Sequence, residues 1–116
     1  MAGDSVYIQV PKDRVLEGSA FVATAYFRTR STGAAATPTS IKYRVDNLTT
    51  CTELADWTTV TAASNVSINV TATHNAIQNA SNTRERVQLT VAMDFELSTQ
   101  VRETAEWDVE NLYGSP

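Results

Sequence analysis

The residues whose chemistry could support catalysis are few and widely spaced. The chain has a single histidine, His74, and a single cysteine, Cys51. A reactive cysteine needs a nearby base, and a zinc site needs several His or Cys ligands. We therefore predict that Cys51 is a small strand residue and that His74 forms a hydrogen bond at a loop edge. No glycine-rich phosphate loop, nucleophile elbow or supported carboxylate pair is recognisable. The sequence thus predicts no catalytic, cofactor-binding or metal-binding residue, and a protein that is not an enzyme.

Acidic residues near the C-terminal end offer the best case for a calcium site. They are Glu103, Glu106, Asp108 and Glu110. Residues two apart lie roughly 6–7 Å apart along one face of a strand. Calcium needs six to eight oxygens that converge on one point, and a straight row does not converge. We predict a solvated face, with Arg84, Arg86 or Arg102 as cross-strand partners.

Glu103 and two further acidic residues need separate explanations. Glu103 has the parity of inward-facing residues, which predicts either a bulge or an inward charge that discourages edge pairing. Asp94 and Glu96 lie at an expected hairpin tip and raise the calcium hypothesis again. A solvated tip is the preferred interpretation there.

The two tryptophans could form a carbohydrate-binding platform if they are exposed. Trp107 shares the parity of Val101, Ala105 and Val109, so we predict that it lies in the core. For Trp57 the pattern is more open, and a core position is again the favoured interpretation.

The element that organises the chain is a hairpin over 87–109. Val87, Leu89, Val91 and Met93 alternate with small or polar residues, and a second alternation over 101–109 follows the short link 94–98. A period of two is typical of strands, and a short link makes the two strands antiparallel neighbours. An isolated hairpin is marginal in water, so other strands must cover its apolar face.

Alternation predicts those other strands along the rest of the chain. They are expected over 6–10 (ending at Pro11), 20–28, 41–46, 48–51 (weak), 57–61 and 65–72. A turn is expected over 53–56 and a loop over 29–39, where three alanines adjoin Gly33 and Pro38. Both faces of the 20–28 strand are apolar, which predicts cover on each side or an oligomer contact. Ala76 and Ile77 are expected to close the base of the core.

Length and composition bound the type of molecule. At 116 residues, with 42% hydrophobic and 19% charged residues, the chain is expected to be one globular domain over 1–116 with short flexible ends. Its net charge of −4 argues against a nucleic-acid partner, because phosphate binding needs clustered cations. We find neither a membrane-spanning run nor a secretory signal, so we expect no membrane association.

The order of these patterns resembles that of immunoglobulin-like and fibronectin type III-like domains. Segment 15–19 before a Phe/Tyr-rich strand is similar to their opening, and 43–46 followed by 56–58 is similar to their third strand and its successor. Segment 66–77 leading into 86–93 resembles a later corner of the fold. The resemblance implies an all-β fold, an immunoglobulin-like antiparallel β-sandwich of about seven strands.

A Thr/Ala/Asn-rich domain of this kind is also similar to small structural proteins of tailed bacteriophages. That similarity implies a non-enzymatic virion protein, a capsid decoration or a neck or tail accessory module. Its expected partners are phage capsid, neck or tail proteins and copies of itself, and its expected location is the virion, after synthesis in the host cytoplasm. The alternative is a glycan- or receptor-binding adhesion module that uses the loops and Trp57.

Overall fold

Eight strands and no helix make up the part of the chain that can be described. The structure is a computed structural model, and it describes residues 4–10, 14–29, 34, 37–95 and 99–112. The strands are β1 (Asp4–Gln9), β2 (Arg14–Leu16), β3 (Phe21–Thr29), β4 (Ser40–Asn47), β5 (Thr52–Val60), β6 (Asn65–Val70), β7 (Arg84–Phe95) and β8 (Thr99–Glu110). Within these residues no helix is long and apolar enough to cross a bilayer.

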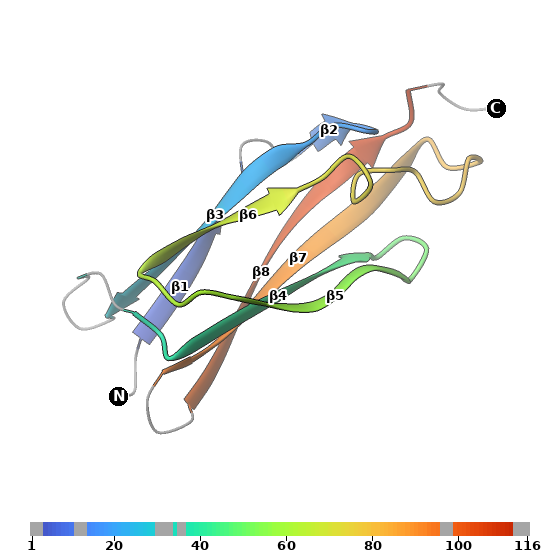
Figure 1. Cartoon of the computed structure of the whole chain (residues 1–116). Coiled ribbons are helices and arrows are strands. Elements are labelled where there is room, and N and C mark those ends of the chain that lie inside the picture. Colours follow the sequence, from blue (N-terminus) through green and yellow to red (C-terminus); the bar gives the residue numbers. More distant parts are fainter. Residues whose placement is uncertain (1–3, 11–13, 30–33, 35–36, 96–98, 113–116) are drawn as a thin grey trace.

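The strands form two packed sheets (Figure 1). One has three strands in the order β1-β3-β6, and the other has five in the order β2-β8-β7-β4-β5. The predicted all-β sandwich is therefore confirmed, with eight strands. One detail of the prediction is wrong: the sandwich is not wholly antiparallel, because the short edge strand β2 runs parallel to β8.

The predicted hairpin is confirmed as the longest pair of strands, β7 and β8. Its register runs without a shift from Arg84↔Glu110 to Phe95↔Thr99. The inward row of β7 is fully buried, and Trp107 of β8 lies opposite Val87 in the core. Removing these side chains from water supplies most of the driving force for packing the two sheets.

The other layer covers this face with small and β-branched residues. Ala23 and Ala25 of β3 pair in register with Ile68 and Val66 of β6, and all four are buried. The predicted alternation of β6 is confirmed. Along β3, however, only the row that includes Phe27 is buried, and Val22 on the opposite face is 48% exposed.

The prediction for 48–56 is wrong in its detail. The expected weak strand over 48–51 is a turn, in which the Asn47 side chain accepts a hydrogen bond from the backbone N–H of Thr50 at 3.0 Å. Cys51 ends this turn with φ of 57°, a left-handed conformation that does not continue a strand. The expected turn over 53–56 instead belongs to β5. Hydrogen bonds between side chains and the nearby backbone thus place the turn at 48–51, before β5, and not at 53–56.

Several predictions fall on residues outside the described part of the chain. They concern Pro11, most of the 29–39 loop, Glu96 in the hairpin tip, and the two chain ends at 1–3 and 113–116.

Candidate functional site

One end of the sandwich gathers three connections and the end of β8. Segments 17–20, 48–51 and 71–83 lie there together with the C-terminal end of β8, at the right of Figure 1. Loops at one end of a rigid sandwich are a common location for binding surfaces. Hydrogen bonds to buried polar side chains hold these loops together.

Glu85 is the buried anchor of this end. It is 1% exposed, and it lies on the inward row of β7 next to Val87. Its carboxylate accepts hydrogen bonds from the backbone N–H groups of Gln78 (2.7 Å) and Asn79 (2.9 Å). The side-chain amides of Asn47 (2.8 Å) and Asn82 (3.0 Å) donate two more. One carboxylate thus joins the 71–83 connection to the end of β4.

The ionisation of Glu85 follows from this arrangement. Burial by itself would raise the pKa, because it disfavours the charged form. The donors from Gln78, Asn82, Asn79 and Asn47 outweigh burial and leave the pKa of Glu85 below its ordinary value. Glu85 is therefore a carboxylate at neutral pH, fully occupied by its structural partners.

Asn75 is the second buried anchor, with no exposed surface. Its side-chain oxygen accepts the indole N–H of Trp107 at 2.7 Å, and its amide donates to the carbonyl of Ser19 at 2.7 Å. Its own carbonyl accepts the N–H of Gly18, whose φ of 76° suits glycine. Asn75 thus ties the 71–83 connection to the 17–20 turn and to the core.

The C-terminal end of β8 is fastened to the same loops. The side-chain amide of Asn111 donates to the carbonyls of Ala80 (3.2 Å) and Asn82 (3.0 Å). The backbone N–H of Leu112 donates to the Glu17 carboxylate at 2.8 Å. These bonds hold the loops in one conformation, so a partner that binds here does not have to order them first.

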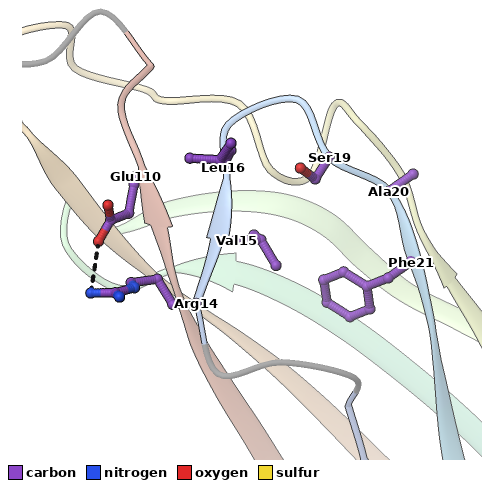
Figure 2. Close-up of a pocket in the computed structure, with 7 residues that line it drawn as sticks. All are labelled: Arg14, Val15, Leu16, Ser19, Ala20, Phe21 and Glu110. Atoms are coloured by element: carbon purple, nitrogen blue, oxygen red, sulfur yellow. Dashed lines mark ion pairs between the residues drawn. The ribbon is translucent and has the colours of Figure 1, made fainter.

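A pocket opens beside this end, between β2 and the start of β3. It encloses about 460 Å³ and is lined by Arg14, Val15, Leu16, Ser19, Ala20, Phe21 and Glu110. Figure 2 shows Val15 and Phe21 facing the space between the two strands, with the Arg14–Glu110 ion pair at 3.3 Å on one side. Phe21 also packs edge-on against Trp107, with ring centroids 5.0 Å apart. The pocket therefore has an apolar floor supported by the core.

A second pocket adjoins the first where the start of β3 meets the end of β6. Ala20 and Phe21 line both pockets, and Val22, Val70 and Ala72 contribute to the second. Leu16 is 53% exposed beside them. We call the two pockets with Leu16 and Val22 the β2–β3 groove.

The outer face of the five-stranded sheet carries the predicted ion pairs. Arg86 forms ion pairs with Glu106 and Asp108, each at 2.8 Å, and Arg84 forms one with Glu110 at 3.3 Å. Hydrogen bonds to Glu106 and Asp108 raise the pKa of Arg86, and the Arg86 and Gln88 donors lower that of Glu106. The prediction of a solvated, arginine-paired acidic face is confirmed. In the described residues no group of three His, Cys, Asp or Glu side chains could hold a metal ion.

The predictions for the remaining singled-out residues have mixed outcomes. His74 is confirmed at a loop edge, where its Nδ1 accepts the N–H of Thr71 at 3.2 Å, and burial lowers its pKa. Cys51 lies exposed in a turn, so its strand assignment is wrong. Glu103 is exposed, and the unbroken β7–β8 register excludes the bulge, while the inward charge stays a prediction. Asp94 accepts a hydrogen bond from Ser40 at 2.9 Å.

The two tryptophans have opposite positions. Trp107 is fully buried, as predicted. Trp57 is half-buried on the outer face of the five-stranded sheet, where Lys42, Arg44 and Arg102 surround its ring. The favoured core interpretation of Trp57 is therefore wrong.

Sequence reasoning missed the buried polar anchors. Glu85 has the parity of Val87 and Leu89, and that parity is a signal for an inward position. Asn47 likewise shares the parity of Val45. Asn75 lies in a polar connection with no periodicity, and nothing in its neighbourhood marks it as buried.

Comparisons with known proteins give no relative. No protein-family model, no curated protein and no solved structure matches the chain. The functional conclusions therefore depend on the geometry above.

Proposed function

We propose that this chain is a non-enzymatic structural protein of a phage virion, a capsid decoration or a neck or tail accessory module. It acts through protein–protein contacts with copies of itself and with a larger capsid, neck or tail protein. We also propose that the sandwich is immunoglobulin-like. Two observations support this: the order of the strand patterns along the sequence, and the way the chain passes back and forth between the two sheets.

The observation that carries the proposal is the β2–β3 groove. Leu16 and Val22 are large aliphatic side chains left about half exposed beside an apolar floor of Val15 and Phe21. A contiguous apolar surface rimmed by polar groups is typical of a protein contact site. The neighbouring loops are already fixed by Glu85 and Asn75, which lowers the entropic cost of docking.

The open edge of β8 is the less favourable place for such a contact. Among the described residues β8 has a partner on its second side only at 108–110, so 99–107 form an unpaired edge. Glu103 lies exposed within it, and a charge at this position discourages strand addition. We therefore assign the contact to the β2–β3 groove.

Substitution of Val22 by lysine is expected to reduce self-association. The charge would have to be buried against the partner copy, while the exposed position leaves the fold intact. Sedimentation velocity of the purified chain over a range of concentrations measures this: we expect concentration-dependent oligomers that weaken about tenfold or more in Val22→Lys, since about 1.4 kcal/mol corresponds to a factor of ten.

Leu48→Lys is the matched control. Leu48 is an aliphatic residue 41% exposed in the β4–β5 turn, outside the groove. Its substitution is expected to leave the sedimentation unchanged. Oligomers that persist in Val22→Lys, or that are lost equally in both variants, would remove the groove from the proposal.

A second candidate function is glycan binding, favoured by the position of Trp57. A half-buried indole on the outer face of a sheet, with three cations over its ring, offers an aromatic and polar surface for contact with a sugar. Binding of any saccharide that Trp57→Ala abolishes would support it.

A further inference from the structure

A β-bulge sets the position of Trp57. Two residues of β5, Asp56 and Trp57, lie opposite the single residue Arg44 of β4. The flanking pairs are Tyr43↔Thr58 and Val45↔Ala55. An extra residue changes the alternation of a strand, and bulges often re-aim a side chain beside a binding site. Here the bulge brings Trp57 to the outer face, whereas Ala55 packs against the core.

Three cationic side chains gather at the Trp57 ring. Lys42 Nζ lies 4.7 Å from the ring centroid, and the guanidinium carbons of Arg102 and Arg44 lie at 5.5 and 5.6 Å. They come from β4 and β8, with β7 between these strands. In the register Ala92 of β7 lies between Lys42 and Arg102. Its neighbours Val91 and Met93 point inward, so Ala92 faces the outer side of the sheet, yet it is only 1% exposed. Side chains therefore cover Ala92 from the outer face, where Trp57 and its cations lie.

The charges of this cluster are only partly balanced. Arg44 is paired with Asp46 at 2.6 Å and with Glu53 at 3.1 Å. Lys42 has no carboxylate partner among the described residues, and its contact is with the indole. Asp56, beside Trp57, lies near Arg44 as well, so the case for an external anion depends on Lys42. An external anion at Lys42 would supply the carboxylate partner that this ammonium group does not have among the described residues.

We propose that the Trp57 cluster binds an anionic sugar, with a carboxylate or sulfate group at Lys42 and the sugar against the part of the indole that the three cations leave exposed. This inference rests on the second candidate function and names its ligand class. A charged hydrogen bond from Lys42 would be stronger than one between neutral groups. Thr90, which pairs with Arg44 across β4 and β7, and Thr104 beyond it supply hydroxyl groups on the same rows for the sugar hydroxyls.

The chain offers a direct readout for each tryptophan. Its two indole N–H groups give two nuclear magnetic resonance signals, and Trp57→Phe identifies the Trp57 signal by removing it. Trp107 is an internal reference, because its indole N–H is buried against Asn75. The probes are trigalacturonate for carboxylated sugars, a heparin hexasaccharide for sulfated sugars, and maltotriose as the neutral sugar.

We expect one or both charged sugars to shift the Trp57 signal in a saturable way while the Trp107 signal stays constant. Lys42→Gln should weaken this binding about five- to tenfold, in the range expected for loss of one charged hydrogen bond. Arg84→Gln is the matched control, because Arg84 is a cation on the same face, away from Trp57 and paired with Glu110. It should change the affinity less than about twofold, a change equivalent to about 0.4 kcal/mol.

Three outcomes would overturn the inference in different ways. Equal affinity for maltotriose would show a neutral glycan site and leave the second candidate function in place. No shift with any of the three sugars would remove both the inference and that function. Equal weakening by Arg84→Gln and Lys42→Gln would show unspecific attraction between charges.

Discussion

Replacement of Glu85 by alanine is expected to lower the free energy of unfolding by about 3–5 kcal/mol. The substitution leaves four buried or half-buried donors, from Asn47, Gln78, Asn79 and Asn82, without their acceptor. Each unsatisfied donor costs about 1–3 kcal/mol, partly relieved when the loop shifts or admits water. Urea denaturation followed by circular dichroism measures the change.

Glu53→Ala is the control for this substitution. Glu53 forms an ion pair with Arg44, and half of its side chain is exposed. Exposed pairs contribute little, so we expect a change within about 0.5–1 kcal/mol. A Glu85→Ala variant no less stable than Glu53→Ala would show that the carboxylate does not hold the loops.

The same carboxylate gives the stability a specific pH dependence. The pKa of Glu85 is lower in the folded chain than its ordinary value of 4.5, so the folded state binds fewer protons than the unfolded state. Its contribution is complete above 4.5 and is lost as the pH falls below that value toward the folded pKa. Glu85→Gln should remove this part of the acid slope. An acid slope identical to that of the unaltered chain would contradict the assignment.

Replacement of Trp107 by alanine is expected to cost about 3–5 kcal/mol of unfolding free energy. The indole is fully buried, packs against Phe21 and donates to Asn75. Its loss leaves a cavity between the sheets and an unsatisfied amide oxygen. The same denaturation experiment measures the effect.

Trp57→Ala provides the comparison within one chain. This indole lies on the outer face, half-buried among cations, and we expect its removal to cost about 1 kcal/mol. Equal effects of the two substitutions would mean that the two tryptophans do not occupy different environments. A double-mutant cycle of Asn75→Ala with Trp107→Phe should also show a coupling of about 1 kcal/mol for the hydrogen bond.

Much of the sandwich could be predicted because alternation reports directly on a half-buried strand. Alternation predicts core positions for the rows of Val87 in β7 and Val66 in β6, and both residues are buried. Alternation fails where side chains bond to the backbone or where a bulge changes parity. The Asn47 bond to Thr50 stabilises a turn over 48–51, where the pattern indicated a weak strand, and the bulge at Trp57 moves an aromatic residue to the outer face.

The hydrogen bonds at the loop end of the sandwich could not be predicted from the sequence, for a different reason. Asn75 becomes a buried hub only because the fold brings Ser19 and Trp107, far away in the sequence, to its side chain. Glu85 has inward parity, but three of its four donors come from a polar connection without any period, and the fourth, Asn47, comes from β4. The groove likewise depends on β2 joining the edge of β8, a parallel pairing that no local pattern indicates.

The most direct test of the proposed function is association with particles. Tagged chain and tagged Val22→Lys are each mixed with purified phage particles from the host that produces this protein and then sedimented through a gradient. The account predicts that the unaltered chain sediments with the particles, as does tagged Leu48→Lys treated in the same way, and that Val22→Lys stays at the top. The account would be contradicted if the unaltered chain were absent from the particle fraction, or if Val22→Lys sedimented with the particles as well as the unaltered chain does.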